Sequence, residues 1–121
     1  MMPAAAKPNA YPKLPKRVRG AGGWIRVISV KRPGEYHDKG FTVTHGEPCW
    51  GSWEPSTRTI RVEKGAPRAF QWRVYFHELT HAAIEDAGLH HLLADSSEET
   101  LCDALATART QEMHGQLQID V

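Results

Sequence analysis

The sequence predicts an α+β fold in which a small, largely antiparallel sheet is followed by two helices. Short runs of β-branched and aromatic residues, separated by glycine and proline, occupy the first half of the chain. After residue 67 the spacing of the apolar residues changes to the period of a helix. With 121 residues, of which 40% are hydrophobic and 24% charged, the chain is expected to form one domain with a modest core.

Residues 1–17 are expected to form a flexible or extended arm, and residues 18–121 the domain itself. Residues 1–16 contain four of the eight prolines and show no apolar period. We expect the basic residues of this region to keep the arm solvated; the alternative is that they contact the phosphates of a nucleic acid. Five of them lie within the first twenty positions, with no acidic residue among them: Lys7, Lys13, Lys16, Arg17 and Arg19.

Three strands are predicted in the first half of the chain. The first, Trp24–Val30, is dense in β-branched and aromatic residues and follows a glycine-rich turn, so it can form a hairpin with the segment around Val18. A short strand is expected at Phe41–Thr44, between segments interrupted by glycine and proline. The third, Arg58–Val62, alternates polar and apolar residues, which is typical of a half-exposed strand at the edge of a sheet.

Two helices are predicted in the second half. The first runs for about twenty residues after Pro67 and ends before Gly88, a natural C-terminal stop. The second is expected to begin around Ser96, to end at about Met113 and to be terminated by Gly115. The apolar residues of the first helix populate one side at helical spacing: Phe70, Val74, Leu79, Ala82 and Ala83.

Composition and charge exclude several classes of protein. The 15 basic and 14 acidic residues nearly cancel, so the net charge indicates neither a nucleic acid nor a membrane as partner. Two cysteines, Cys49 and Cys102, are too few for the disulfide framework of a secreted domain. No apolar stretch approaches the ~20 residues that span a bilayer, and the first residues do not form a signal peptide. We therefore expect a cytoplasmic protein.

The sequence His77-Glu78-Leu79-Thr80-His81, inside the first predicted helix, indicates a metal site. Residues four apart on a helix lie about 40° apart in rotation and one turn along the axis, so both imidazoles can bind one ion. Glu78 is displaced by about 100° and can act on a water that the metal activates. The ligand types favour zinc, and other first-row divalent ions also suit such ligands.

A catalytic zinc site usually has three protein ligands, so the third ligand must lie downstream of the two histidines. Glu99 is the predicted ligand because it lies at the start of the second helix, where an antiparallel return can bring it back to His81. Its neighbour Glu98 is the alternative, and only one of the two is expected to bind. Asp103, one turn after Glu99, is expected to accept a hydrogen bond from a ligating histidine. In a competing interpretation Glu99 forms a capping box with Ser96.

The two motifs, His77-Glu78-Leu79-Thr80-His81-Ala82 and Glu99-Thr100-Leu101-Cys102-Asp103, together resemble those of the thermolysin-like gluzincins. In that family HExxH supplies two ligands and the general base, and ExxxD supplies the third ligand and an aspartate behind it. Strands followed by the motif helix are also similar to the minimal zincin core of small phage and bacterial proteins. The resemblance implies a zinc metallopeptidase acting on a peptide or protein substrate, with His77, His81 and Glu99 as ligands and Glu78 as base.

The chain also departs from that family. Glu85 stands where the family often has aspartate, and the helical subdomain that supplies a histidine or tyrosine to the oxyanion is missing. The metzincin arrangement is excluded because Ile84 and Ala87 stand where glycine and histidine are required. Four residues are candidates for the oxyanion role: His90, His91, His114 and Tyr75.

Several alternatives stay open at the level of the sequence. Cys102 could complete a closed, structural zinc site instead of being a small buried residue. A zincin fold could also serve as a catalytically silent module that docks a host partner. An extended substrate is expected to bind the Arg58–Val62 strand by β-augmentation. His37 and His45 are interpreted as loop residues, and the tryptophans Trp50, Trp53 and Trp72 as core residues rather than a binding surface.

Overall fold

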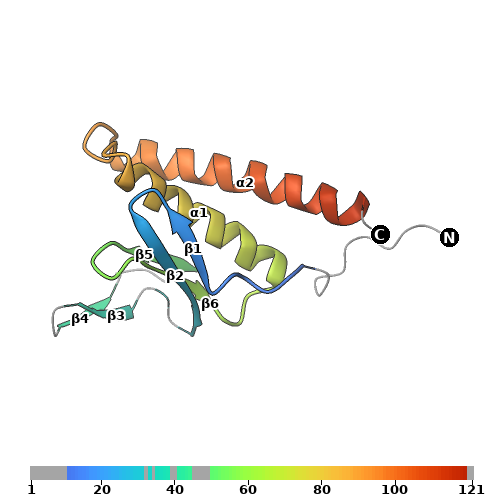
Figure 1. Cartoon of the computed structure of the whole chain (residues 1–121), viewed down its shortest axis with the longest axis horizontal. Helices are drawn as coiled ribbons and strands as arrows, with labels where there is room; N and C mark the ends of the chain where they lie inside the picture. Colours follow the sequence, from blue (N-terminus) through green and yellow to red (C-terminus); the bar gives the residue numbers. More distant parts are fainter. Residues whose placement is uncertain (1–10, 32, 34, 39–40, 45–49, 120–121) are drawn as a thin grey trace.

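The computed structural model describes residues 11–31, 33, 35–38, 41–44 and 50–119. In this part of the chain a four-stranded sheet is covered on one face by a helix, a second helix lies against the first, and a two-stranded ribbon projects beside the sheet (Figure 1). The predicted α+β class is confirmed. The elements are β1 (Arg17–Gly20), β2 (Gly23–Val30), β3 (Glu35–Asp38), β4 (Phe41–Thr44), β5 (Gly51–Glu54), β6 (Thr59–Glu63), α1 (Arg68–Asp86) and α2 (Asp95–Ile119).

The sheet has the strand order β1-β2-β6-β5 and is mixed. The hairpin β1–β2 and the pair β5–β6 are antiparallel, whereas β2 and β6 run parallel. A parallel pair requires a long connection, and here the chain between β2 and β6 contains the ribbon β3–β4 and strand β5. Two of the three pairings therefore agree with the predicted largely antiparallel sheet, and the predicted hairpin around Val18 is present.

The strand predicted at Arg58–Val62 does not form the sheet edge. As β6 it pairs with β2 on one side and β5 on the other, and Ile60 and Val62 are fully buried. The sequence analysis missed β5 because its four residues lie in a stretch dominated by turn-forming residues and offer too short a pattern. Strand β5 takes the edge position, which changes where an extended ligand could pair with the sheet.

The hydrophobic core lies between the sheet and α1. Strands β2 and β6 contribute aliphatic side chains to one face, and the buried side of α1 packs on them. Trp53 and Trp72 pack against this core as partly buried residues, whereas Trp50 is 56% exposed. The buried core residues are Ile25, Val27, Ile60, Val62, Val74, Tyr75, Phe76, Ala82 and Ala106.

The helix ends agree with the prediction for α1 and differ for α2. Gly88 adopts a positive φ of 72° just after α1, as a glycine at a helix C-terminus commonly does. Helix α2 continues through Gly115 to Ile119, so the predicted stop is wrong. One glycine in a helix costs only about 1 kcal/mol, which packing elsewhere can offset. The helix begins at Asp95, so Ser96 lies inside its first turn and the capping-box interpretation is also wrong.

The segment before β1 packs against the domain from Tyr11 onwards, earlier than the start near Val18 that the sequence predicts. Tyr11 is 4% exposed, and its hydroxyl lies 2.7 Å from Nδ1 of His114. Trp72 Nε1 donates a 2.8 Å hydrogen bond to the carbonyl of Pro12. His37, predicted in a loop, lies instead in β3, where it pairs with Thr42 of β4. The predictions for residues 1–10, for His45 and for Cys49 lie outside the described residues.

A charged pair connects the sheet turns to the end of α1. The two terminal guanidinium nitrogens of Arg58 each lie 2.8 Å from a carboxylate oxygen of Asp86. The same carboxylate also accepts a hydrogen bond from the backbone N–H of Gly22. These hydrogen bonds hold the pKa of Asp86 at about 2, well below its usual range.

No helix in the described residues is both long and apolar enough to cross a bilayer.

Candidate metal centre

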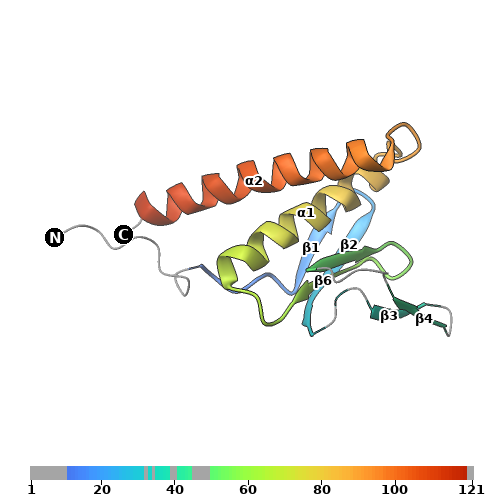
Figure 2. The same cartoon turned by 180° about the vertical axis from the view of Figure 1, so that it is seen from behind.

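Helices α1 and α2 lie side by side, as the two opposite views show (Figures 1 and 2). The short connection at residues 87–94 turns the chain back, so the first turns of α2 return to the motif on α1. Cys102 and Ala106, two small residues four apart on α2, are buried and allow this close approach. The residues next to them on α2 are thereby brought to His77 and His81.

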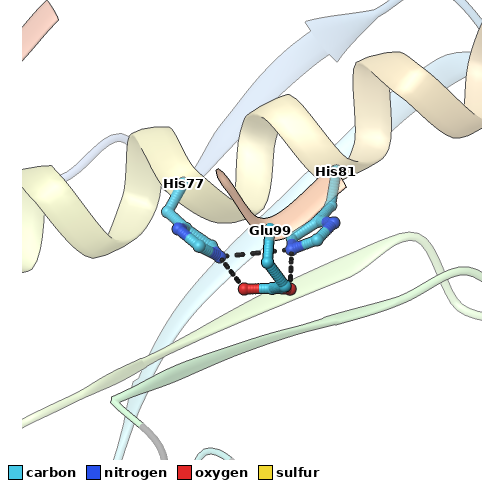
Figure 3. A group of neighbouring side chains, drawn as sticks. All are labelled: His77, His81 and Glu99. Atoms are coloured by element: carbon cyan, nitrogen blue, oxygen red, sulfur yellow. Dashed lines mark hydrogen bonds and ion pairs between the residues drawn. The ribbon is translucent and has the colours of Figure 1, made fainter. Parts of the chain in front are cut away.

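The three predicted ligands converge on one point (Figure 3). The Nε2 atoms of His77 and His81 are 3.2 Å apart. One oxygen of Glu99 lies 3.1 Å from Nε2 of His77, and the other lies 2.7 Å from Nε2 of His81. One ligand atom from each residue can be chosen so that all lie within 4.8 Å of one another. The structure therefore brings together His77, His81 and Glu99.

The opposite nitrogens of the two imidazoles contact carboxylates. Nδ1 of His77 lies 2.8 Å from Oδ1 of Asp103, which is the role that the sequence predicts for Asp103. Nδ1 of His81 lies 2.5 Å from Oε2 of Glu98. The sequence analysis treated Glu98 only as a rival ligand to Glu99 and missed this contact. The contact could have been predicted from the sequence, because adjacent residues of a helix point about 100° apart and can contact two different partners.

The donor chemistry of this group fits a divalent cation such as zinc. A carboxylate only accepts hydrogen bonds, so the Nδ1 atoms that face Asp103 and Glu98 carry protons. The Nε2 atoms face Glu99, and in the neutral form of each ring they hold a lone pair that can bind a cation. Two nitrogens bound to tetrahedral zinc at about 2.0–2.1 Å are about 3.3 Å apart, and the observed separation is 3.2 Å.

Protons compete with a metal ion for this group. Burial acts to lower the pKa of His81, but the carboxylates of Glu78, Glu98 and Glu99 outweigh it and raise the pKa overall. A metal ion must displace the proton from Nε2 before it can bind. Metal affinity is therefore expected to fall as the solution becomes more acidic.

Glu78 lies on the buried side of α1, one residue after His77, and is 9% exposed. Burial raises the pKa of its carboxyl to about 7, the positive charge of His81 acts in the opposite direction, and the charge of Glu99 raises it further. A carboxyl with a pKa near neutrality can both accept and return a proton. A cation bound to the three ligands would favour its ionised form.

The centre opens into a cavity of about 900 Å³ between β5, α1 and α2. Gly51 on β5 lets α1 approach closely, because a Cβ atom there would lie 2.3 Å from Cγ1 of Val74 and 3.3 Å from Cγ of Glu78. At one end Trp50 and Phe70 meet edge to face, with ring centroids 5.3 Å apart. Besides the residues of the centre, the lining includes Trp50, Trp53, Pro55, Phe70, Arg73, Val74, Glu85 and His90.

Of the four candidates for the oxyanion role, His90 lines the cavity. The ring of His91 lies beside it, with centroids 3.8 Å apart and planes tilted by 43°, but His91 does not line the cavity. Tyr75 is 3% exposed in the core, and His114 contacts Tyr11. The sequence analysis missed Arg73, an exposed cation in the cavity lining one turn before His77.

Cys102 does not contribute to the metal-binding group. Its side chain is fully buried between the helices, and burial together with the nearby carboxylates raises the pKa of its thiol to about 12. Zinc binds the thiolate form of cysteine, which is scarce at such a pKa. Among the described residues the donor set is therefore two imidazoles and one carboxylate, the number of protein ligands that a catalytic zinc ion usually has.

No family model matches the sequence, and searches of the curated proteins and of the solved structures gave no significant match. What the centre does is therefore inferred from its own residues. These are three side chains that could hold a metal ion, a further carboxylate at Nδ1 of each imidazole, and a buried carboxyl beside an open cavity.

Proposed function

We propose that the chain is a zinc-dependent hydrolase of the metallopeptidase type, which cleaves a peptide bond with His77, His81 and Glu99 as zinc ligands. The observation that carries the proposal is the convergence of these three side chains beside the buried carboxyl of Glu78. A structural zinc site is usually closed by four protein ligands, whereas this group has three ligands among the described residues and faces a cavity. The gluzincin-like spacing of the two motifs is in agreement with the proposal.

Each protein group has a defined task in this reaction. Zinc, when bound, lowers the pKa of a water and polarises the carbonyl of the substrate. Glu78 takes the proton from that water as it attacks the carbonyl carbon, and returns the proton to the amine that leaves. Asp103 and Glu98 keep the two imidazoles in the tautomer that offers Nε2 to the metal. His90 is the proposed donor to the oxygen that gains charge.

The substrate is proposed to bind in an extended conformation along β5. Among the described residues this strand is at the edge of the sheet and pairs only with β6, so the backbone groups of its other side would bind a peptide by β-augmentation. Gly51, Ser52 and Trp53 of β5 also line the cavity. Trp50 and Phe70 would favour an apolar side chain at one end, and Arg73 an acidic group.

The metal content of the protein is the first test. Elemental analysis of the purified chain after supply of zinc should give about one zinc per chain, and both His77→Ala and Glu99→Ala should lose it. The matched control is Glu112→Gln, an exposed α2 carboxylate far along the helix from Glu99, which should retain it. Wild-type protein that takes up no zinc would contradict the proposal.

Activity separates the enzyme from its main alternative, a catalytically silent module. Zinc-loaded wild type and Glu78→Gln should be incubated with a pool of unstructured peptides, and new termini identified by mass spectrometry. We expect cleavage by wild type and by Glu112→Gln, and none by Glu78→Gln although it retains zinc. Zinc retention with equal cleavage by Glu78→Gln would remove Glu78 from the mechanism, and zinc retention without any cleavage would favour the binding module.

A further inference from the structure

The outer face of the β1–β2 hairpin carries arginines around an exposed tryptophan. Ile25 and Val27 of β2 face the core, so the side chains that alternate with them project from the opposite face of the sheet. The strand register places Arg17 directly opposite Arg26, and Arg19 directly opposite Trp24. All three arginines are exposed, and Trp24 is 51% exposed. We call Arg17, Arg19, Trp24 and Arg26 the hairpin patch.

The hairpin patch is unfavourable for the fold itself. Like charges directly opposite each other on neighbouring strands are destabilising, and Arg17 and Arg26 form such a pair. None of the ion pairs among the described residues gives these arginines an acidic partner. The guanidinium carbon of Arg17 instead lies 4.3 Å from the centroid of the Trp24 ring, and that of Arg19 lies 5.6 Å from it. Features that oppose local stability in this way often mark a functional surface.

Further cations lie near the start of β1 on the α1 side of the sheet, where Val27 and Ser29 of β2 line a second hollow. Lys16 precedes Arg17 in the chain and lines this hollow of about 380 Å³ between the segment before β1, β2 and the start of α1. Four cations line this hollow, and its described lining contains no acidic residue: Lys13, Lys16, Lys64 and Arg68. The hollow therefore lies on the other face of the sheet from the hairpin patch and is not part of it.

Negative charge gathers at the other edge of the sheet. The metal centre holds four carboxylates, those of Glu78, Glu98, Glu99 and Asp103, and faces β5. The hairpin patch belongs to β1 and β2, and β1 is the opposite edge strand. The net charge of +1 therefore conceals a separation of charge between two sides of the molecule. Because the hairpin patch and the metal centre lie at opposite edges of the sheet, the hairpin patch is independent of the proposed hydrolase site.

We propose that the hairpin patch binds single-stranded nucleic acid. Its three arginines would contact phosphates along the backbone, and a base would stack on the exposed part of the Trp24 ring, extending its stack with Arg17. An exposed aromatic ring among cations favours a ligand that has both negative charges along its backbone and flat, unpaired bases. A duplex keeps its bases stacked inside, and an anionic membrane has no such rings to offer.

Binding is tested on the full chain with fluorescein-labelled DNA and RNA strands of mixed sequence, followed by fluorescence anisotropy. Strands of about 20 nucleotides exceed the usual site size, and salt is varied from about 50 to 200 mM. Trp24→Ala should weaken binding about 5- to 150-fold. Arg26→Gln should weaken binding and make the negative slope of log K against log salt less steep by about 0.7, because one phosphate contact is lost. Arg109→Gln, which removes the same charge from exposed α2, is the control and should change neither quantity.

Each other outcome overturns the proposal. No binding to either strand at low salt would show that the cations only solvate the sheet. Equal binding by wild type, Trp24→Ala and Arg26→Gln would place any nucleic-acid site elsewhere in the chain. Tighter binding to a duplex, or binding to anionic lipid vesicles but not to strands, would assign the surface to a different partner. Circular dichroism of each variant checks that these exposed substitutions leave the fold intact.

Discussion

Replacement of Gly51 by alanine tests how closely the edge strand must approach the helix that carries the metal ligands. The new Cβ would lie 2.3 Å from Cγ1 of Val74 and 3.1 Å from the carbonyl oxygen of Arg61. Real carbon atoms do not approach this closely, so β5 or α1 must shift. Glu78 is 3.3 Å from the same position, so the shift would also disturb the proposed base.

The expected loss of stability follows from two opposing effects. Overpacking of a close contact typically costs about 1–3 kcal/mol. Alanine also restricts the unfolded chain more than glycine does, which raises the free energy of unfolding by about 0.4–1 kcal/mol. We therefore expect Gly51→Ala to lower the free energy of unfolding by about 1–2 kcal/mol.

Urea unfolding of four variants measures the effect and identifies its cause. Val74→Ala removes the atom that the new Cβ would contact, so the double variant should be more stable than the sum of the single losses predicts. Gly115→Ala is the matched control, since a Cβ there meets no atom within 4 Å and should stabilise α2 by about 0.5–1 kcal/mol. Wild-type stability of Gly51→Ala, or strict additivity with Val74→Ala, would refute this account of the contact.

Two further predictions concern the carboxylate behind His81 and the charged pair at the end of α1. Glu98→Ala should weaken zinc binding about 10- to 100-fold in a chelator competition, with a smaller effect for Glu98→Gln, because the imidazole loses its orienting acceptor; unchanged affinity would show that Glu98 does not support the ligand. The hydrogen bonds from Arg58 hold the pKa of Asp86 at about 2, below its ordinary value of 3.8. Because the folded pKa is the lower one, this stabilisation is nearly complete above about pH 4 and is lost as the pH falls through 2. Allowing for solvent screening, Asp86→Asn should lose about 1–2 kcal/mol at neutral pH and only a small part of that at pH 2, where the folded-state carboxyl is half protonated; an equal loss at both pH values would mean that the charge is not responsible.

Sequence alone was sufficient for features that depend on near neighbours in the chain. The positions of α1, β2 and β4 and the end of α1 at Gly88 follow from periodicity and turn chemistry, which act over a few residues. The HExxH spacing required only that the segment be helical. Glu99 and Asp103 required one further assumption, a direct return of the second helix.

Only the tertiary structure decided the features that depend on contacts between distant segments. The alternating pattern of β6 is the same for an edge strand and for an inner one, and its place was set by β5, a strand too short to have a pattern of its own. Glu98 reaches His81 through the rotation and depth of α2 against α1, which are set by burial of Cys102 and Ala106. The pairing of Arg17 with Arg26 likewise depends on the hairpin register. Local sequence determines which elements form, whereas packing determines which of their side chains meet.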